Sequence, residues 1–370
     1  LRAKILGQPC GELEISSGAS PNKVTDLLRS SKNTRVLPNA QSPDTVYITL
    51  KKTSGETLAL KHITLRKEVP DLEGSLRFST SITEDSLQRD FTINALYYEI
   101  SRGQLLNPRT GFGDISERII RTVIEPGLFF QEVPEMILRA IRYSCGLNFS
   151  IEAAAMKAIK NNIFRLKECA PEALRRELNA LLLADKEFGC GPEQLASALK
   201  MCKDLGCFEI IFPLANLNQA CIDKCVQMPC ILDARMCGLL YAAKNIGSCL
   251  KKWDYDSPFI KRCQNLSEAA RLEGSLEEIA EPLAKIGLDS ALRACSYFKK
   301  DSSVFNELLN AGAPLNKESI AITGTEIAKR IGPSGKSISL IKTKLYKEVL
   351  LNPYLNNNEA LNALLDSMGC

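Results

Sequence analysis

The sequence predicts an α+β fold in which a small mixed α/β domain is followed by an elongated all-α region. β-rich runs occur at residues 46–50 and 63–65, and both precede the turn-forming segment 107–113. From residue 126 to the end of the chain, apolar residues recur at helical spacing and strand patterns nearly vanish. Strands at one end of a chain and helices at the other are typical of an α+β protein.

The individual elements follow from periodicity and from helix-breaking residues. Helices are predicted in the N-terminal domain at 21–28 and 85–96, the second one preceded by polar residues that suit a helix start. Later helices are expected at 135–145, 151–161, 171–184, 192–205 and 338–351. Glycine and proline clusters near 189–192, 256–258 and 311–314 mark the edges of subdomains. These edges predict four parts, at residues 1–121, 122–190, 191–312 and 313–370.

Composition excludes several classes of protein. A chain of 370 residues with 45% hydrophobic and 24% charged residues is expected to be soluble and to hold two to four domains. It contains no uncharged apolar run long enough for a membrane span. The 14 cysteines form no C-x-x-C pair, so we expect free thiols in a reducing, intracellular compartment. A single histidine, His62, argues against Ser-His or Cys-His catalysis.

Basic residues gather in two helical stretches, although the net charge is only +4. Such clusters are either solvated helix faces or contacts for a phosphate backbone. The second interpretation predicts RNA contacts at Lys157, Lys160, Arg175, Arg176, Lys336, Lys342 and Lys344.

The run Gln88-Arg89-Asp90-Phe91-Thr92-Ile93-Asn94-Ala95-Leu96 carries a family resemblance. It resembles the R-R-D-F-T-I-N-A-L segment of the class II nucleotidyltransferases, which are the bacterial-type CCA-adding enzymes and poly(A) polymerases. Further segments resemble family motifs in the same chain order, at residues 1–7, 12–17, 19–24, 107–121, 132–143, 171–178 and 322–333. The resemblance implies a nucleotidyltransferase head (1–121), a nucleotide- and RNA-binding neck (122–190), a helical body (191–312) and an RNA-binding tail (313–370). It also implies RNA, and not DNA, as the partner.

Two carboxylates stand where the resemblance implies the catalytic metal ligands. Glu12 and Glu14 are two residues apart on a predicted strand and therefore lie on one face, where they could share Mg²⁺ ions. The family has aspartate at both positions, and the alternative is that both glutamates are merely exposed strand residues. Other charges of the family pattern are changed at Ala3, Lys61 and Gln88.

The resemblance also implies a nucleotide-binding set, formed by Arg2, Arg89, Asp90, Asn94, Arg139 and Arg142. Helix capping at Asp90 and ion pairs of the neck at Arg139 and Arg142 are the structural alternatives. The Asp and Arg with which the family reads a base edge are replaced by Val133 and Met136. Neither side chain can offer a paired hydrogen-bond pattern to a base.

These replacements favour a catalytically degenerate pseudoenzyme, because the changes fall on chemical positions while the apolar framework is kept. It would bind tRNA or rRNA as a subunit of an organellar ribonucleoprotein such as a ribosome, in a mitochondrion or plastid. The alternative is an active, Mg²⁺-dependent enzyme that adds CMP and AMP to tRNA or polyadenylates RNA, and a third is an ATP sensor. The chain opens with Leu1, so we expect residues upstream, where the family has a Gly-Gly phosphate loop.

Overall fold

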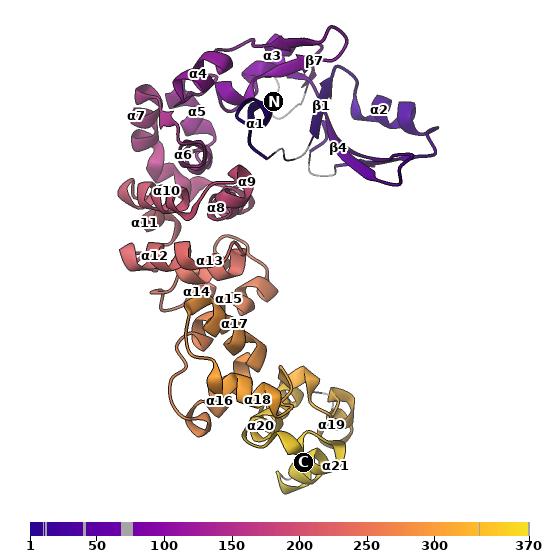
Figure 1. The fold of residues 1–370 in the computed structure, drawn as a ribbon, viewed down its shortest axis with the longest axis vertical. Helices are drawn as coiled ribbons and strands as arrows, with labels where there is room; N and C mark the ends of the chain where they lie inside the picture. The colour runs from indigo at the N-terminus through magenta and orange to yellow at the C-terminus, as the bar shows by residue number, and fades with distance from the viewer. Residues whose placement is uncertain (10, 12, 40–41, 68–76, 333, 369–370) are drawn as a thin grey trace. The chain divides into compact units, whose positions relative to one another are not determined.

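The computed structural model describes residues 1–370 except positions 10, 12, 40–41, 68–76, 333 and 369–370. Two compact units divide the chain, Leu1–Ile210 and Ile211–Cys370. The first combines a small sheet with helices, and the second is helical (Figure 1). This is the predicted α+β class. The finer predicted boundaries at 121, 190 and 312 stay predictions. No helix in the described part of the chain is long and apolar enough to cross a membrane.

Unit 1 contains, in order, α1 (Arg2–Ile5), β1 (Leu13–Ser17), α2 (Pro21–Leu28), β2 (Thr34–Pro38), β3 (Thr45–Lys51), β4 (Thr57–Thr64), β5 (Arg66–Lys67), β6 (Arg77–Phe78), α3 (Ile82–Leu87), the 3-10 turn η1 (Thr92–Asn94), β7 (Tyr97–Glu99), β8 (Gln104–Leu106), α4 (Gly111–Glu117), β9 (Ile119–Ile120), α5 (Pro126–Glu132), α6 (Met136–Leu147), β10 (Ser150–Ile151), α7 (Ala153–Asn162), η2 (Ile163–Glu168), α8 (Pro171–Leu182), α9 (Ala184–Phe188) and α10 (Pro192–Asp204). The helix α11 (Cys207–Ile211) ends at the boundary.

Unit 2 contains α12 (Gln219–Gln227), α13 (Leu232–Leu239), α14 (Ile246–Lys251), α15 (Ser257–Ala269), α16 (Leu276–Ile286), α17 (Leu288–Phe298), α18 (Ser303–Asn310), η3 (Lys317–Ser319), α19 (Gly324–Ile331), α20 (Gly335–Leu351), η4 (Pro353–Leu355) and α21 (Asn358–Ser367). Its core gathers side chains of α15, α16, α17 and α20. The helices predicted at 192–205 and 338–351 are confirmed as α10 and α20, within the usual uncertainty of helix ends.

The head sheet has the strand order β1-β4-β3-β2, with β1 parallel to β4 and the other neighbours antiparallel. The helix α2 starts where Ser20 accepts a hydrogen bond from the Lys23 N–H, as its N-cap. Val24 on this helix packs against Val46, Ile48 and Leu60 on one face of the sheet. Because side chains alternate along a strand, Glu14 and Lys61 point to the opposite face.

The helix predicted over residues 85–96 is wrong. The helix α3 ends at Leu87, and Phe91 instead makes an antiparallel bridge with Thr122. The Asp90 carboxylate accepts hydrogen bonds from the Phe91 N–H (2.7 Å) and from Asn94 Nδ2 (2.8 Å). Such local side-chain bonds compete with helix propagation. The apolar spacing that suggested a helix serves instead to bury Phe91 and Ile93 completely.

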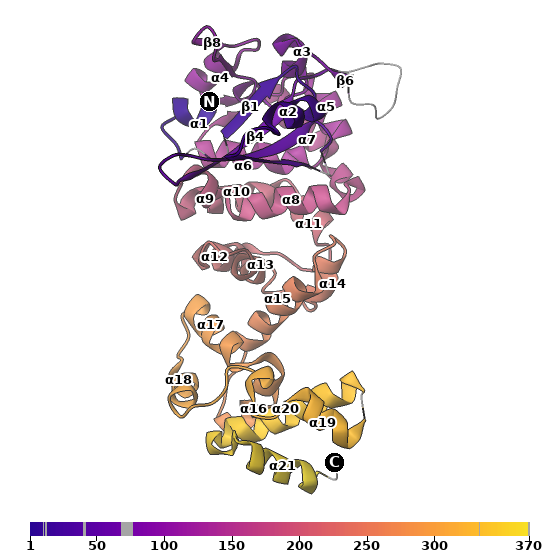
Figure 2. The same ribbon diagram turned by 90° about the vertical axis from the view of Figure 1, so that its right-hand side faces the viewer.

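The helices of the neck position the rest of the candidate site. Helix α6 packs against α8 and α10, and Figure 2 shows α8 and α10 running along the same side of α6. The apolar stripe of α8 includes Leu174, Leu178 and Leu181, each fully buried. Glu177 lies within this stripe and is only 1% exposed. A buried carboxylate needs charged partners, and α6 supplies them.

Candidate nucleotide and metal site

The strand β1 presents Glu14 at the position implied for a metal ligand. Its register partner on β4 is Lys61, and Lys61 Nζ lies 3.3 Å from Glu14 Oε1. The Glu14 side chain is 45% exposed and that of Lys61 is 24% exposed. An ion pair this open to water contributes about 1 kcal/mol or less. Glu14 is therefore paired, but weakly.

The described residues do not complete a metal centre. Glu12 lies outside them, and Glu14 is the one described member of the predicted pair. Elsewhere in the described part of the chain, no three His, Cys, Asp or Glu side chains gather closely enough to hold a metal ion. The Lys61 ammonium also places a positive charge beside Glu14, which opposes a bound cation. We therefore derive no catalytic step through a metal from this geometry.

A second group of side chains forms a closed ring where the head meets the neck. Asn94 donates to Asp90 (2.8 Å), and Asp90 accepts from Arg139 Nη1 (2.9 Å). Arg139 Nε donates to Glu177 Oε2 (3.0 Å), which also accepts from Arg142 Nη2 (3.3 Å). Contacts from Glu187 to Arg142 and Arg2, and from Arg2 to Asn94, close the ring. We call this group the arginine–carboxylate ring; its members are Arg2, Asp90, Asn94, Arg139, Arg142, Glu177 and Glu187.

The ring is electrically balanced, because three arginines face three carboxylates. Burial alone would raise the pKa of Glu177, but the hydrogen bond from Arg139 and the charges of Arg139 and Arg142 hold it below its ordinary value. The pKa of Arg139 is raised: burial lowers it, and its contacts with Glu177 and Asp90 more than compensate. The two shifts act in the same direction, because each stabilises the charged form of its group, Glu177 as a carboxylate and Arg139 as a guanidinium.

The ring keeps some capacity to bind an anion. Arg2 Nε and Arg142 Nε are buried and have no hydrogen-bond partner among the described residues. Both guanidinium groups also lie over the Tyr143 ring, with Cζ at 4.5 Å and 4.9 Å from its centroid. A triphosphate that bound here would have to compete with carboxylates for the same arginines, which costs desolvation on both sides.

Arg89 lies apart from this ring, although the family resemblance grouped it with the nucleotide-binding residues. It contacts Asp85, whose carboxylate is fully buried, at 2.7 Å. Asp85 also accepts from the Tyr97 hydroxyl (2.7 Å) and from the Arg66 N–H (2.9 Å). These contacts make Arg89 part of the packing of α3 in the head.

The two positions implied for base reading, Val133 and Met136, have apolar side chains that are at least partly buried. Val133 is half-buried at the end of α5, and Met136 is buried at the start of α6. Neither can donate or accept a hydrogen bond to a base edge. Val133 and Met136 therefore supply no polar contact that would distinguish one base from another.

The predicted RNA contacts divide into exposed and buried residues. Lys157 and Lys160 on α7, Arg176 on α8, and Lys336 and Lys344 on α20 are exposed, whereas Arg175 is half-buried. Lys342 is only 7% exposed, and its ammonium lies 2.7 Å from Glu318 Oε2. The structure thus corrects the surface position expected for Lys342, whose charge is already satisfied inside unit 2.

Sequence reasoning missed two members of the ring, Glu177 and Glu187. Glu177 could have been found, because it is an acidic residue in the middle of the apolar stripe of α8. Glu187 carried no comparable signal, since α9 is a five-residue helix with charged residues on several sides.

Comparison with known proteins agrees with the fold. Residues 1–121 match the poly(A) polymerase head domain. A CCA-adding enzyme of Geobacillus sp. (strain WCH70) is 24% identical over 384 residues, covering 99% of this chain and 90% of the relative. Residues 1–121 therefore carry a poly(A) polymerase head domain, and the chain is similar to a CCA-adding enzyme over nearly its whole length.

One further relative is matched over only part of its own length, and two solved structures show the likeness of the fold. The CCA-adding enzyme of Limosilactobacillus reuteri (strain DSM 20016) is 27% identical over 275 residues, and the match spans 73% of this chain but 65% of that enzyme. The Bacillus stearothermophilus CCA-adding enzyme in complex with CTP has a TM-score of 0.69 at 23% identity, covering 100% of this chain and 91% of that one. The Thermotoga maritima enzyme complexed with tRNA has a TM-score of 0.54 at 16% identity, covering 99% of this chain and 89% of that one.

Proposed function

We propose that this chain is an RNA nucleotidyltransferase that transfers nucleotides from CTP or ATP to the 3′ end of tRNA, by CCA addition or polyadenylation. The observation that carries the proposal is the near full-length likeness to CCA-adding enzymes. Five of the six residues implied for nucleotide binding also meet in the arginine–carboxylate ring. This favours the active reading, which was the alternative in the sequence analysis, over the degenerate one.

In this proposal, Glu14 and Glu12 would hold Mg²⁺ through their carboxylate oxygens, and the ion would supply the charge stabilisation that nucleotidyl transfer needs. Lys61 would have to release Glu14 for this, and an exposed ion pair of this kind costs only about 1 kcal/mol to open. Arg2, Arg139 and Arg142 supply positive charge for the triphosphate. We propose tRNA as the partner because a family member has been solved with tRNA, and nothing here supports rRNA or a ribosome-like assembly. A reducing intracellular compartment also stays a proposal, supported by the 12 cysteines that are free thiols in the described chain.

The test is incorporation of labelled CTP and ATP into a tRNA transcript that lacks its CCA end, in the presence of Mg²⁺. Replacing Glu14 by Ala is expected to lower the rate by about 100-fold or more, because misplacing a reacting group by ~1 Å already has that effect. Glu56→Ala is the matched control, since Glu56 is an exposed strand-end carboxylate paired with Lys52. Equal rates for Glu14→Ala and the wild type would contradict the role given to Glu14.

A second candidate function is tRNA binding without transfer. The observation that favours it is the combination of Lys61 at Glu14 with apolar side chains at Val133 and Met136. No incorporation by a folded wild-type protein that still binds the transcript would select this candidate over the enzyme.

Binding of tRNA is expected to weaken steeply with salt, because lysines that contact phosphates release counterions. Replacing Lys157 and Lys160 by Gln should lower the slope of log affinity against log salt by about 1–2 units, or roughly 0.9 per phosphate contact. Lys51 and Lys52, two exposed lysines of the head, provide a control pair with the same charge change. An identical slope for both pairs of substitutions would remove α7 from the RNA-binding surface.

A further inference from the structure

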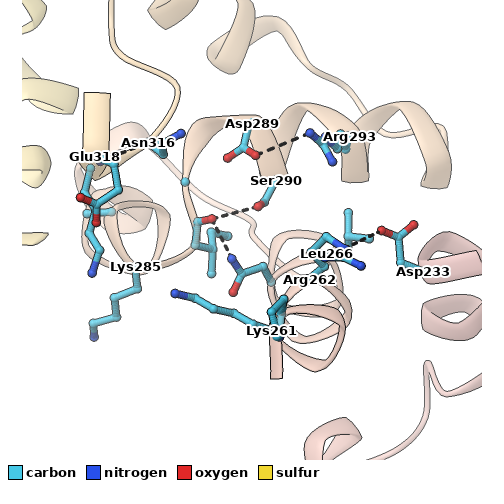
Figure 3. A pocket seen from close by; sticks show the side chains of 16 residues that line it. Asp233, Lys261, Arg262, Leu266, Lys285, Asp289, Ser290, Arg293, Asn316 and Glu318 are labelled. Carbon is cyan, nitrogen blue, oxygen red and sulfur yellow. Dashed lines mark hydrogen bonds and ion pairs between the residues drawn. The ribbon is translucent and has the colours of Figure 1, made fainter. Parts of the chain in front are cut away.

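A hollow of about 380 Å³ lies wholly within unit 2. The side chains that line the hollow carry an excess of positive charge, whereas those of the arginine–carboxylate ring in unit 1 are balanced. It is formed mainly by α15, the end of α16, the start of α17, and η3 (Figure 3). Three acidic side chains line it, those of Asp233, Asp289 and Glu318. Five cationic side chains also line it, those of Lys261, Arg262, Lys285, Arg293 and Lys317. The lining therefore carries a net charge of +2.

Most of these charges are already paired. Arg262 contacts Asp233 at 3.3 Å, and Arg293 contacts Asp289 at 3.9 Å. Lys285 contacts Glu281 at 2.9 Å, outside the hollow. The lining carboxylate of Glu318 is taken by Lys342, which lies behind it. After these pairs are counted, the net positive charge of the hollow rests on the two remaining lysines of its lining.

Lys261 and Lys317 are those two lysines. In the described chain, no carboxylate lies within 4.0 Å of either ammonium group. Lys317 is held by the hydroxyls of Ser339 (2.7 Å) and Thr343 (3.3 Å), which are neutral partners. Burial lowers the pKa of Lys317, and the nearby charge of Lys261 lowers it further; Glu318 acts in the opposite direction and Lys342 in the same one. The two lysines therefore repel each other, and an anion in the hollow would relieve that repulsion.

The N-terminus of α17 also borders the hollow, but its first N–H groups already donate hydrogen bonds within the protein and are not free to bind an anion. The Leu288 N–H donates to the Tyr346 hydroxyl (3.2 Å), and the Asp289 N–H donates to the Leu315 carbonyl (3.1 Å). Gly287, with φ of +92°, turns the chain here, and a Cβ at this position would lie 2.6 Å from Asp289 Oδ1. The charge of the hollow thus comes from side chains, carried on separate elements.

We propose that this hollow binds a phosphate group, held by Lys261 from α15 and Lys317 from η3. A phosphate dianion matches the two net charges, and its several oxygens can accept from both lysines at once. The phosphate is either a free phosphate or a phosphodiester of bound RNA; both present oxygens that accept hydrogen bonds from lysine, but the diester carries one negative charge and balances only one of the two lysines. The site is a binding site beyond nucleotidyl transfer, and it stands whether or not the chain transfers nucleotides.

The test is calorimetric titration of the full chain with inorganic phosphate and, separately, with a short RNA oligonucleotide that has hydroxyl groups at both ends. Lys261→Gln is the test variant, because Lys261 is exposed and its removal leaves the core intact. Lys251→Gln is the matched control on α14, and Lys317→Gln is a second test variant. Circular dichroism establishes that each variant is folded.

We expect Lys261→Gln and Lys317→Gln each to weaken binding about 10-fold or more, with Lys251→Gln equal to the wild type. A loss confined to inorganic phosphate identifies free phosphate as the ligand, and a loss confined to the oligonucleotide identifies the RNA backbone. If folded Lys261→Gln and Lys317→Gln bind both probes as the control does, or if the wild type binds neither, the proposal is overturned. Nucleotide incorporation does not enter this result, so failure here leaves the proposed function in place.

Discussion

Replacing Glu177 by Gln is expected to lower the free energy of unfolding by about 3–5 kcal/mol. Glu177 is 1% exposed and accepts hydrogen bonds from both Arg139 and Arg142. Gln keeps the size of the side chain but removes the charge, and breaking a buried ion pair from one side leaves uncompensated charge behind. Urea unfolding of the two proteins at neutral pH measures the difference.

The pH dependence of the free energy of unfolding provides a second test of the role of Glu177. The pKa of Glu177 in the folded protein lies below its ordinary value of 4.5, so its charged form stabilises the fold above that pH. This contribution is lost as the pH falls through the lowered pKa, and the stabilities of the wild type and Glu177→Gln should then converge. Glu172→Gln, an exposed acid on the same helix, should cost less than ~1 kcal/mol. A similar cost at both positions would mean that the ring does not stabilise the neck.

The wild-type protein is expected to discriminate poorly between CTP and ATP. A site built to hydrogen-bond its substrate rejects the wrong one by roughly 10⁴-fold, whereas apolar contacts give about 10–200-fold. Val133 and Met136 offer only apolar contacts, so we expect the ratio of kcat/KM values for CTP and ATP to be about 10-fold or less. Single-nucleotide incorporation into tRNA measures both constants.

The direction of this effect can be tested with Val133→Asp, which restores an acceptor at a half-buried position. The ratio of kcat/KM values should rise in this variant, while Leu128→Asp, a change at an exposed position of α5, should leave it unchanged. A wild-type ratio near 10⁴ would show that other residues read the base and would contradict the role assigned to the two positions.

The sequence predicted the framework well, because it rests on local patterns. The helix 21–28 and the strand 46–50 follow from capping and alternation, and they appear as α2 and within β3. The helix 85–96 could not be predicted correctly, because Phe91 pairs with Thr122, which is distant in the sequence. A non-local bridge of this kind overrides helical spacing.

The candidate site was predictable only in part, for a related reason. Arg139 and Arg142 lie on one helix face by spacing alone, but their carboxylate partners come from α8, α9 and the segment before η1. The same limit applies to Lys342, whose helix position looked exposed until η3 brought Glu318 against it. Spacing predicts which side chains share a surface; tertiary packing decides which charges are left for a ligand.

The central claim is that this chain still extends tRNA ends in spite of its altered motifs. The most direct measurement is transfer of labelled nucleotide by the wild-type protein, with Mg²⁺, to a tRNA transcript that lacks CCA and ends in a free 3′-hydroxyl. We predict incorporation on this transcript and none on the same transcript ending in a 3′-deoxynucleotide, because the hydroxyl is the acceptor. Absence of incorporation on both transcripts, from a folded protein that binds them, would contradict the claim.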